Sequence, residues 1–190
     1  MPSTFRIPRA TVTGLYGRVM EAYARRTYGQ VPDNAYVLWH HRRALRAVLS
    51  LESKVARFDA LDAHLKSYAL LASAGTIGCS WCLDFGYFLA HDEGLDTAKV
   101  REVPRWRTSE VFTDLERDVM DYAEAMSETP LRVTDAMVAG LVERLGAEAV
   151  VELTQMVALE NMRSRFNAAA GLQSQGFSDV CELPLATVRP

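Results

Sequence analysis

The sequence lacks an excess of positive charge, and it lacks a long apolar run. Its 21 Lys and Arg residues are outnumbered by 24 Asp and Glu, for a net charge of −3. That balance does not indicate the basic surface with which proteins bind nucleic acid. The most apolar stretch, residues 68–77, is about half the roughly 20 residues that a membrane-spanning helix needs. We therefore expect neither nucleic acid nor a membrane among the partners.

Cysteine is scarce, and the first residues carry no secretory signal. Residues 1–6 show no positively charged region leading into an apolar core, which predicts a cytoplasmic protein with reduced thiols. Three cysteines, two of them in Cys79-Ser80-Trp81-Cys82, do not make a structural disulfide framework. A close pair in a reducing compartment is more often catalytic or metal-binding, so the choice between these two roles is the central question.

What the sequence does have is helical periodicity. Hydrophobic residues make up 49% of the chain, enough for a sizeable core, and no run alternates as a half-buried strand would. Thr113 with Glu116 forms a capping-box pattern, and Gly171 reads as a C-terminal stop. We predict an all-α single domain with helices over residues 8–28, 35–57, 59–74, 79–93, 96–102, 114–127, 135–145 and 147–170, and an irregular tail over 173–190.

The cysteine pair falls at a predicted helix start. Gly78 and the small residues before it break one helix, and Cys79 opens the next, with Cys82 one turn further on. Residues three apart share a helix face, so the two sulfurs are predicted to lie within disulfide distance. The helix N-terminus offers free N–H donors and a positive dipole end, which favour thiolate over thiol. The pattern therefore predicts a redox-active dithiol.

Two other interpretations of the pair remain open. A structural zinc site needs four ligands, and the remaining candidates (Cys181, His40, His41, His64 and His91) do not pair at ligand spacing. We therefore expect no metal and no bound organic cofactor. Both cysteines could also be small buried hydrophobic residues, as free cysteine often is. From the pattern alone this alternative and redox chemistry are about equally favoured.

Residues 61–95, LDAHLKSYALLASAGTIGCSWCLDFGYFLAHDEGL, resemble the carboxymuconolactone decarboxylase and AhpD-like alkylhydroperoxidase superfamily. The resemblance extends more loosely to about Gly171. It implies an AhpD-like helical bundle, assembly as a homo-oligomer (trimer or hexamer), and reduction of peroxides or electron transfer to a peroxiredoxin through CxxC. It also divides the chain into an N-terminal helical arm (1–58), a family core (59–172) and the tail (173–190).

The resemblance assigns roles to the cysteines, but the proton relay of the family is replaced. It implies that Cys82 is the attacking thiol and Cys79 the resolving one. The family's Glu position falls on Ser67 and its His position on Gly86, and a His often found before the second Cys is Trp81 here. A Glu–His relay typically contributes a hundred- to ten-thousand-fold to rate. The protein therefore has either a substitute relay or a low peroxidase activity.

The substitutes available nearby are poorly placed on a regular helix. Asp84 and His91 point away from the cysteines, and Asp84 is expected to be a helix cap or solvated. His64 shares the face of Ser67 but lies a turn away, so an exposed position is favoured for all three.

Other chemistry-bearing residues have ordinary structural explanations. The aromatic residues near the pair are predicted to belong to the core, with a substrate pocket as the alternative: Trp81, Phe85, Tyr87 and Phe88. A polar cluster in the last helix is predicted to be an intersubunit or solvated face: Glu160, Asn161, Arg163, Arg165 and Asn167. Cys181 has no partner visible in the sequence.

Three functions follow, of which the first is preferred. The first is an AhpD-like thiol-dependent oxidoreductase that reduces a peroxide or a disulfide at Cys79 and Cys82 and is itself reduced by a dithiol donor protein. The second is a lyase or isomerase acting on a small acid or lactone, with His40 and His41 as candidate acid–base groups. The third is a non-enzymatic oligomer that senses redox state.

Overall fold

The computed structural model describes residues 3–181 and 185, and within them the regular structure is entirely helical. The predicted all-α class is therefore confirmed. The elements are α1 (Gly14–Tyr28), α2 (Asp33–Leu38), α3 (Arg42–Val55), α4 (Ala63–Ile77), α5 (Ser80–Asp92), α6 (Thr97–Val100), α7 (Asp114–Ser127), α8 (Asp135–Leu145) and α9 (Ala147–Ala170), with 3₁₀ turns η1 (Val103–Arg105) and η2 (Phe177–Val180). Across the described residues, every helix is too short or too polar to cross a membrane.

Helix boundaries follow their capping residues where the sequence shows them. Thr113 accepts from Glu116 N, and the Glu116 carboxylate accepts from Thr113 N at 2.7 Å, so α7 begins with the predicted capping box. Gly171 ends α9 with φ +76°, a conformation that favours glycine. A side chain on Gly171 would also meet Thr4 and Arg6, whose backbone N–H groups donate to Gly171 O and Ala170 O.

Several predicted boundaries are wrong. The helix expected over 35–57 is two helices, because the chain turns at residues 39–41 and the ring of His41 caps α3 by accepting from Ala44 N at 3.1 Å. The first helix begins at Gly14 rather than residue 8, and the third begins at Ala63, capped by Asp62. The helix expected over 96–102 is only α6 followed by η1, and the tail expected to be irregular contains η2; its residues 182–184 and 186–190 lie outside the described residues.

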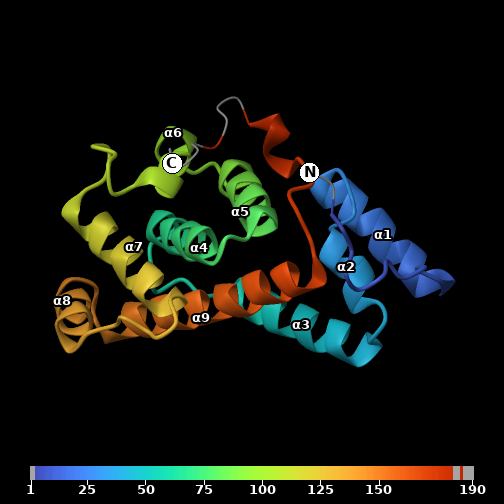
Figure 1. Ribbon diagram of the computed structural model, residues 1–190, viewed down its shortest axis with the longest axis horizontal. Helices are drawn as coiled ribbons and strands as arrows, with labels where there is room; N and C mark the ends of the chain where they lie inside the picture. Colours follow the sequence, from blue (N-terminus) through green and yellow to red (C-terminus); the bar gives the residue numbers. More distant parts are fainter. Residues whose placement is uncertain (1–2, 182–184, 186–190) are drawn as a thin grey trace.

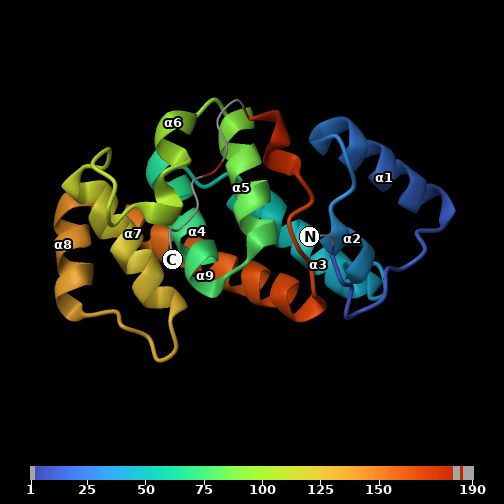
Figure 2. The same ribbon diagram turned by 45° about the horizontal axis from the view of Figure 1, so that its top comes forward.

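The core is built around α4. This helix is apolar on nearly all sides, as a central helix must be, and α5, α7 and α9 pack around it (Figures 1 and 2). Tyr68 and Leu71 of α4 are almost fully buried, together with Met120 of α7 and Leu153 and Val157 of α9. The helix that ends just before the cysteines is therefore held on several sides, which fixes the position of the pair.

The helices α1 and α3 lie at the end of the molecule away from α7 and α8, beside and below the C-terminal end of α9 (Figure 1). Val55 of α3 packs against Met156 and Leu159 of α9, but most of α3 and nearly all of α1 remain accessible in the isolated chain. Leu15 and Val19 of α1 are 73% and 57% exposed. The division of the chain near residue 58 stays a prediction.

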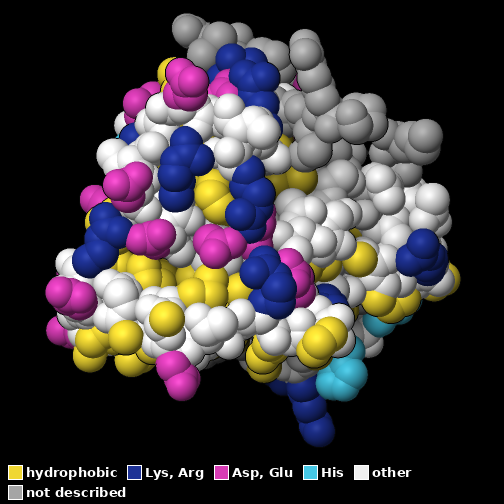
Figure 3. Space-filling model, turned by 60° about the vertical axis from the view of Figure 1, so that its left-hand side comes forward, with side chains coloured by type: hydrophobic (Ala, Val, Ile, Leu, Met, Phe, Trp, Pro, Cys, Tyr) yellow, Lys and Arg dark blue, Asp and Glu magenta, His cyan; other side chains and the backbone are white. Residues whose placement is uncertain are grey.

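The opposite end, formed by α7 and α8, has a mixed surface. Figure 3 shows acidic and basic side chains interspersed there, with apolar side chains between them. Ion pairs account for part of this pattern: Arg107–Asp121, Arg132–Glu128 and Arg144–Asp118. Exposed pairs of this kind contribute little to stability, typically below about 1 kcal/mol each.

Candidate active site at the cysteine pair

A glycine turn places the cysteines at the start of α5. Helix α4 ends at Gly78, whose φ of +80° lets the chain reverse, and Cys79 N donates to Ala74 O at 2.9 Å. Cys79 is the N-cap of α5, and its sulfur accepts from Cys82 N at 3.1 Å. Cys79 thus lies one residue before the helix rather than in its first turn, and its sulfur faces the free N–H groups there.

The predicted proximity of the two sulfurs is confirmed. Cys79 and Cys82 form a disulfide with their Cα atoms 5.3 Å apart. The third cysteine, Cys181, is a free buried thiol. Burial, together with the negative charge of Asp84, raises the pKa of Cys181 above its usual value. Cys181 is therefore kept in the less reactive thiol form.

The pair is largely enclosed in the isolated chain. Cys79 and Cys82 are 2% and 7% exposed, and Ala74, Leu172 and Phe177 pack against them. Apolar residues thus cover one side of the disulfide. The other side is polar.

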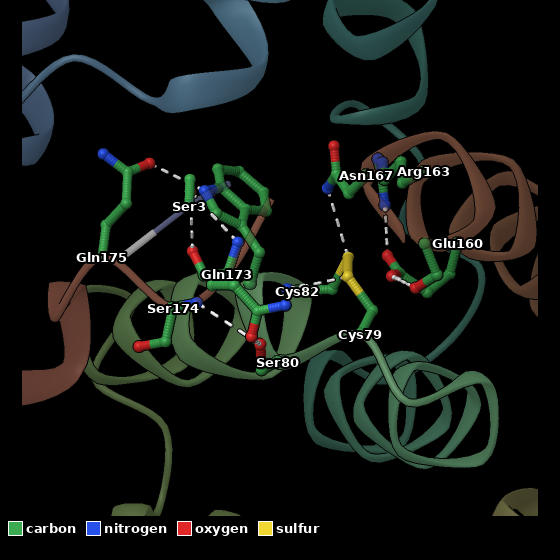
Figure 4. Close-up of a disulfide and its surroundings, with 12 residues drawn as sticks. Ser3, Cys79, Ser80, Cys82, Glu160, Arg163, Asn167, Gln173, Ser174 and Gln175 are labelled. Atoms are coloured by element: carbon green, nitrogen blue, oxygen red, sulfur yellow. Dashed lines mark hydrogen bonds and ion pairs between the residues drawn. A yellow bond between two sulfur atoms is a disulfide. The ribbon is translucent and has the colours of Figure 1, made fainter. Parts of the chain in front are cut away.

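That polar side belongs to α9. The amide of Asn167 donates from Nδ2 to the Cys82 sulfur at 3.3 Å, and Figure 4 shows Asn167, Arg163 and Glu160 extending from α9 on one side of the disulfide. Glu160, Ser164 and Asn167 recur at i, i+4 and i+7, so they form one polar face of the helix; they are 6%, 0% and 1% exposed. The prediction that Glu160 and Asn167 belong to an intersubunit or solvated face is wrong: both are buried within the chain itself, where Asn167 contacts the Cys82 sulfur and Glu160 contacts Ser164 and Arg163.

Glu160 is a buried carboxyl. Ser164 Oγ donates to Glu160 Oε1 at 2.7 Å, and Arg163 Nη1 lies 3.3 Å from Oε2. Burial raises the pKa of Glu160 above its usual value, and the hydrogen bond from Ser164 and the charge of Arg163 offset only part of this. Arg163 is in turn held by Glu52 of α3, at 2.8 Å from Nε to Oε1. The polar face of α9 is therefore anchored to α3.

Residues 173–178, which we call the strap, cross the start of α5. Ser174 N donates to Ser80 Oγ at 3.3 Å, and Gln175 Oε1 accepts from Trp81 Nε1 at 2.7 Å. The same Gln175 oxygen accepts from Asp33 N at 2.7 Å, so the strap also joins α5 to α2. In Figure 4, Gln173 and Ser174 lie beside Ser80, and Gln173 N donates to Ser3 Oγ.

Asp84 anchors the strap, and its predicted role as a solvated or capping residue of its own helix is wrong. Its carboxylate is 4% exposed and accepts from the backbone N–H groups of Gln175, Phe177 and Ser178 at 2.8–3.1 Å. Burial by itself would raise the pKa of Asp84, but the hydrogen bonds from Ser178 and Phe177 outweigh it and hold the pKa below 3.8. Asp84 points away from the cysteines, as predicted, because it faces η2.

The aromatic residues near the pair are core residues, as predicted. Trp81 stacks on Phe85 with ring centroids 5.0 Å apart, and Phe177 contacts both rings edge-on. A hollow of about 490 Å³ lies on the outer side of the strap; neither cysteine lines it, and its lining residues are Ser3, Phe5, Arg9, Gln30, Asp33, Ser174 and Gln175.

The family relay positions are unsuited to proton transfer. Gly86 faces α4, and a Cβ placed on it would lie 3.0 Å from Leu71 Cδ2. Leu71 thus fills the space that a His side chain at this position would need. Ser67 lies on α4, half-buried, and a hydroxyl cannot replace a carboxylate as a base.

The histidines considered from sequence lie in other contacts. The ring of His64 pairs with Asp96 N, His40 bonds to Pro8 O, and His41 caps α3. His91 is in the last turn of α5. Over the described part of the chain, no three His, Cys, Asp or Glu residues gather as a metal site would require.

Comparisons with known proteins agree with this geometry. The model of the carboxymuconolactone decarboxylase family matches residues 42–125. The uncharacterized protein YnjA of Escherichia coli (strain K12) is 34% identical over 124 residues, which span 65% of this chain and 66% of that relative.

Two solved structures show the same fold at low identity. A cysteine-to-alanine variant of the debrominase Bmp8 in complex with 2,3,4-tribromopyrrole has a TM-score of 0.80 at 19% identity, covering 93% of this chain and 96% of that one. An alkylhydroperoxidase AhpD core protein, an uncharacterized peroxidase-related protein from Ralstonia eutropha JMP134, has a TM-score of 0.78 at 16% identity, covering 93% and 97%. Residues 42–125, which include the CxxC pair joined at the start of α5, thus match the carboxymuconolactone decarboxylase family, and the chain has an AhpD-like fold.

Proposed function

We propose that the protein is a thiol-dependent oxidoreductase that reduces a peroxide or a disulfide at Cys79 and Cys82. The observation that carries the proposal is the environment of the two sulfurs. Cys79 Sγ accepts from a backbone N–H at the start of α5, and Cys82 Sγ accepts from the Asn167 amide. Donors aimed at sulfur stabilise thiolate over thiol, so both cysteines are prepared for redox chemistry.

With a hydroperoxide, the reduced pair reacts in two steps. The Cys82 thiolate attacks the terminal oxygen; an S–O bond forms, the O–O bond breaks, and the alkoxide leaves as an alcohol after taking up a proton. The Cys79 thiolate then attacks the sulfenic sulfur of Cys82 and displaces hydroxide, which leaves as water, giving the disulfide. A dithiol donor returns two electrons to the pair by exchange and is oxidised to its own disulfide.

Cys82 is assigned the attacking role because of the family resemblance and its position. It is the more exposed of the two residues, and its sulfur faces the polar side formed by α9. The sulfur of Cys79 instead caps the helix, which suits a resolving thiol that need only reach its neighbour. In this proposal the partners are a small oxidant and a dithiol donor protein, and the compartment is the reducing cytoplasm.

Thiol titration tests the proposal directly. The reduced chain has three thiols, and one equivalent of peroxide or disulfide is expected to remove two of them by forming the Cys79–Cys82 disulfide. Cys181→Ser is the matched control, because it should lose the same two thiols. Full retention of all three thiols in the wild type would contradict the proposal.

Turnover then separates the two cysteines. With dithiothreitol as donor, Cys82→Ser is expected to lose turnover. Cys79→Ser, treated with a hydroperoxide in the absence of any thiol donor, should stop after one equivalent with a sulfenic acid that dimedone labels. Hydrogen peroxide, an organic hydroperoxide, a small disulfide and, in view of the debrominase neighbour, a brominated pyrrole form the substrate panel. An unchanged rate in Cys82→Ser would exclude the attacking role of this residue.

A further inference from the structure

Asn167 is the polar side chain that reaches the sulfurs from outside α5. It comes from the last two turns of α9, 85 residues further along the chain than Cys82, and it is 1% exposed. Its Nδ2 donates to the Cys82 sulfur at 3.3 Å. A disulfide sulfur carries lone pairs and no hydrogen, so only the amide N–H can face it favourably. This fixes the orientation of the amide.

The other end of the same amide has no partner. Among the described residues, Asn167 Oδ1 is one of two buried side-chain oxygens or nitrogens without a hydrogen-bond partner. Leaving a buried acceptor unpaired lowers stability, and such an atom calls for an explanation. A packing role alone would be served as well by an apolar residue of the same shape, at no such cost.

We infer that Asn167 is a catalytic residue that activates Cys82, with its N–H donating to the thiolate and its carbonyl oxygen accepting the hydrogen of a thiol or of a bound hydroperoxide. The catalytic role of Asn167 rests on the proposed dithiol chemistry. Its effect on the pKa of Cys82 does not depend on that proposal. The thiol and the hydroperoxide that would donate to this oxygen are present only in the reduced or substrate-bound state. Asn167 Oδ1 is accordingly unpaired while the disulfide is closed. No proton needs to leave the amide in either contact.

Asn167 also supplies a polar contact to the thiol in a chain that has neither the Glu nor the His of the family relay. Ser67 of α4 and Gly86 of α5 occupy the relay positions, and Leu71 fills the space beside Gly86. Support for the thiolate therefore comes from α9 rather than from α4 and α5. Two charged groups of α9, Glu160 and Arg163, lie on the same side of the disulfide as Asn167 (Figure 4) and pair with each other, and Asp84 on α5 faces the strap.

The test is the ionisation of Cys82, measured by thiolate absorbance near 240 nm in a Cys79→Ser, Cys181→Ser background. Asn167→Leu removes the donor and is expected to raise the Cys82 pKa by about one unit, which is about a tenfold smaller thiolate-to-thiol ratio at neutral pH. Asn167→Asp has nearly the same shape but places a carboxylate at the sulfur, so it should raise the pKa further. A Cys82 pKa unchanged in both variants would overturn the inference.

Asn161→Leu is the matched control. Asn161 lies on the same helix and donates to Ser73, Ser127 and Val157, away from the sulfurs. It should lower stability without moving the Cys82 pKa; an equal pKa rise in this variant would assign the effect to loosened packing and overturn the role of Asn167. If Asn167→Leu does not fold, Asn167→Asp decides alone. Wild-type turnover tests the proposed function and the pKa tests Asn167, so the two can fail separately.

Discussion

The central bundle and helix α1 use apolar residues in opposite ways. In the bundle, Leu153 of α9 and Leu71 of α4 are 0% and 2% exposed, and each is surrounded by other helices. In α1, Leu15 and Val19 are more than half exposed. The cysteine pair lies in the well-packed part of the chain, where Val37 of α2 joins the cluster around it. Close packing thus surrounds the site, whereas α1 leaves apolar surface exposed in the isolated chain.

Two leucine substitutions test this difference in packing most directly. Leu153→Ala should lower the free energy of unfolding by about 2–5 kcal/mol, because it leaves a cavity in the core. Leu15→Ala changes the same atoms on an exposed helix and should stay within about 0.5 kcal/mol. Urea unfolding followed by circular dichroism measures both. Equal losses would show that α1 is packed in solution, against this chain or a second copy.

The next largest effect on stability is expected from substituting Asp84, which anchors the strap. Asp84→Asn removes a carboxylate that accepts from three backbone N–H groups and should cost about 1–3 kcal/mol. Hydrogen exchange at Gln175, Phe177 and Ser178 should speed up, as should reduction of the disulfide by a bulky phosphine. Ser178→Ala, which removes only the side-chain contact to Asp84, should give a smaller change. Unaltered exchange in Asp84→Asn would mean that the strap is held by other contacts.

Acid should act on the same contact in wild-type protein. The folded pKa of Asp84 lies below its unfolded value of 3.8, so the stability it contributes is fully present above that pH and is lost as pH falls through the folded value. Exchange at the strap amides, corrected for intrinsic rates, should therefore rise only below about pH 4, and Asp84→Asn should remove this dependence. A strap that opens at higher pH would contradict the assignment.

The smallest effect on stability, and the clearest on association, is expected from α1. We propose that its exposed apolar side chains contact another copy of the chain in a homo-oligomer. Leu15→Lys with Val19→Lys should reduce the assembled mass measured by sedimentation, whereas unfolding measured at a concentration at which the wild type is monomeric should be nearly unchanged. Arg18→Lys with Arg25→Lys, at exposed positions of the same helix, is the control, because it also introduces two lysines but leaves Leu15 and Val19 unchanged. A wild-type protein that sediments as a monomer would contradict the proposal.

The sequence predicted the elements whose signals are local. The capping box at Thr113 and the stop at Gly171 both lie where expected, because each depends on residues within a few positions of one another. The position of Cys79 and Cys82 was predictable for the same reason. The break at residues 39–41 was not, since no Gly or Pro marks it and a histidine ring serves as the cap.

The rest of the site depends on contacts between distant segments. Asp84 meets residues more than 90 positions away, and Asn167 meets Cys82 across 85. In the sequence, Asn167 sits among Arg163, Arg165 and Glu160, which suggests a solvated face. Only packing of α9 against α5 reveals that one stripe of that helix is buried beside the sulfurs. A buried polar side chain of this kind has no local signal to find it by.

The covering of the pair by the strap has a consequence for synthesis. Cys79 and Cys82 leave the ribosome long before Asn167, and longer still before the strap that crosses them. At ordinary elongation speeds that interval is on the order of ten seconds. During this time both thiols are open to cellular oxidants and reductants. The nascent chain thus passes through a period in which both thiols are more accessible than in the finished protein, where α9 and the strap lie over them.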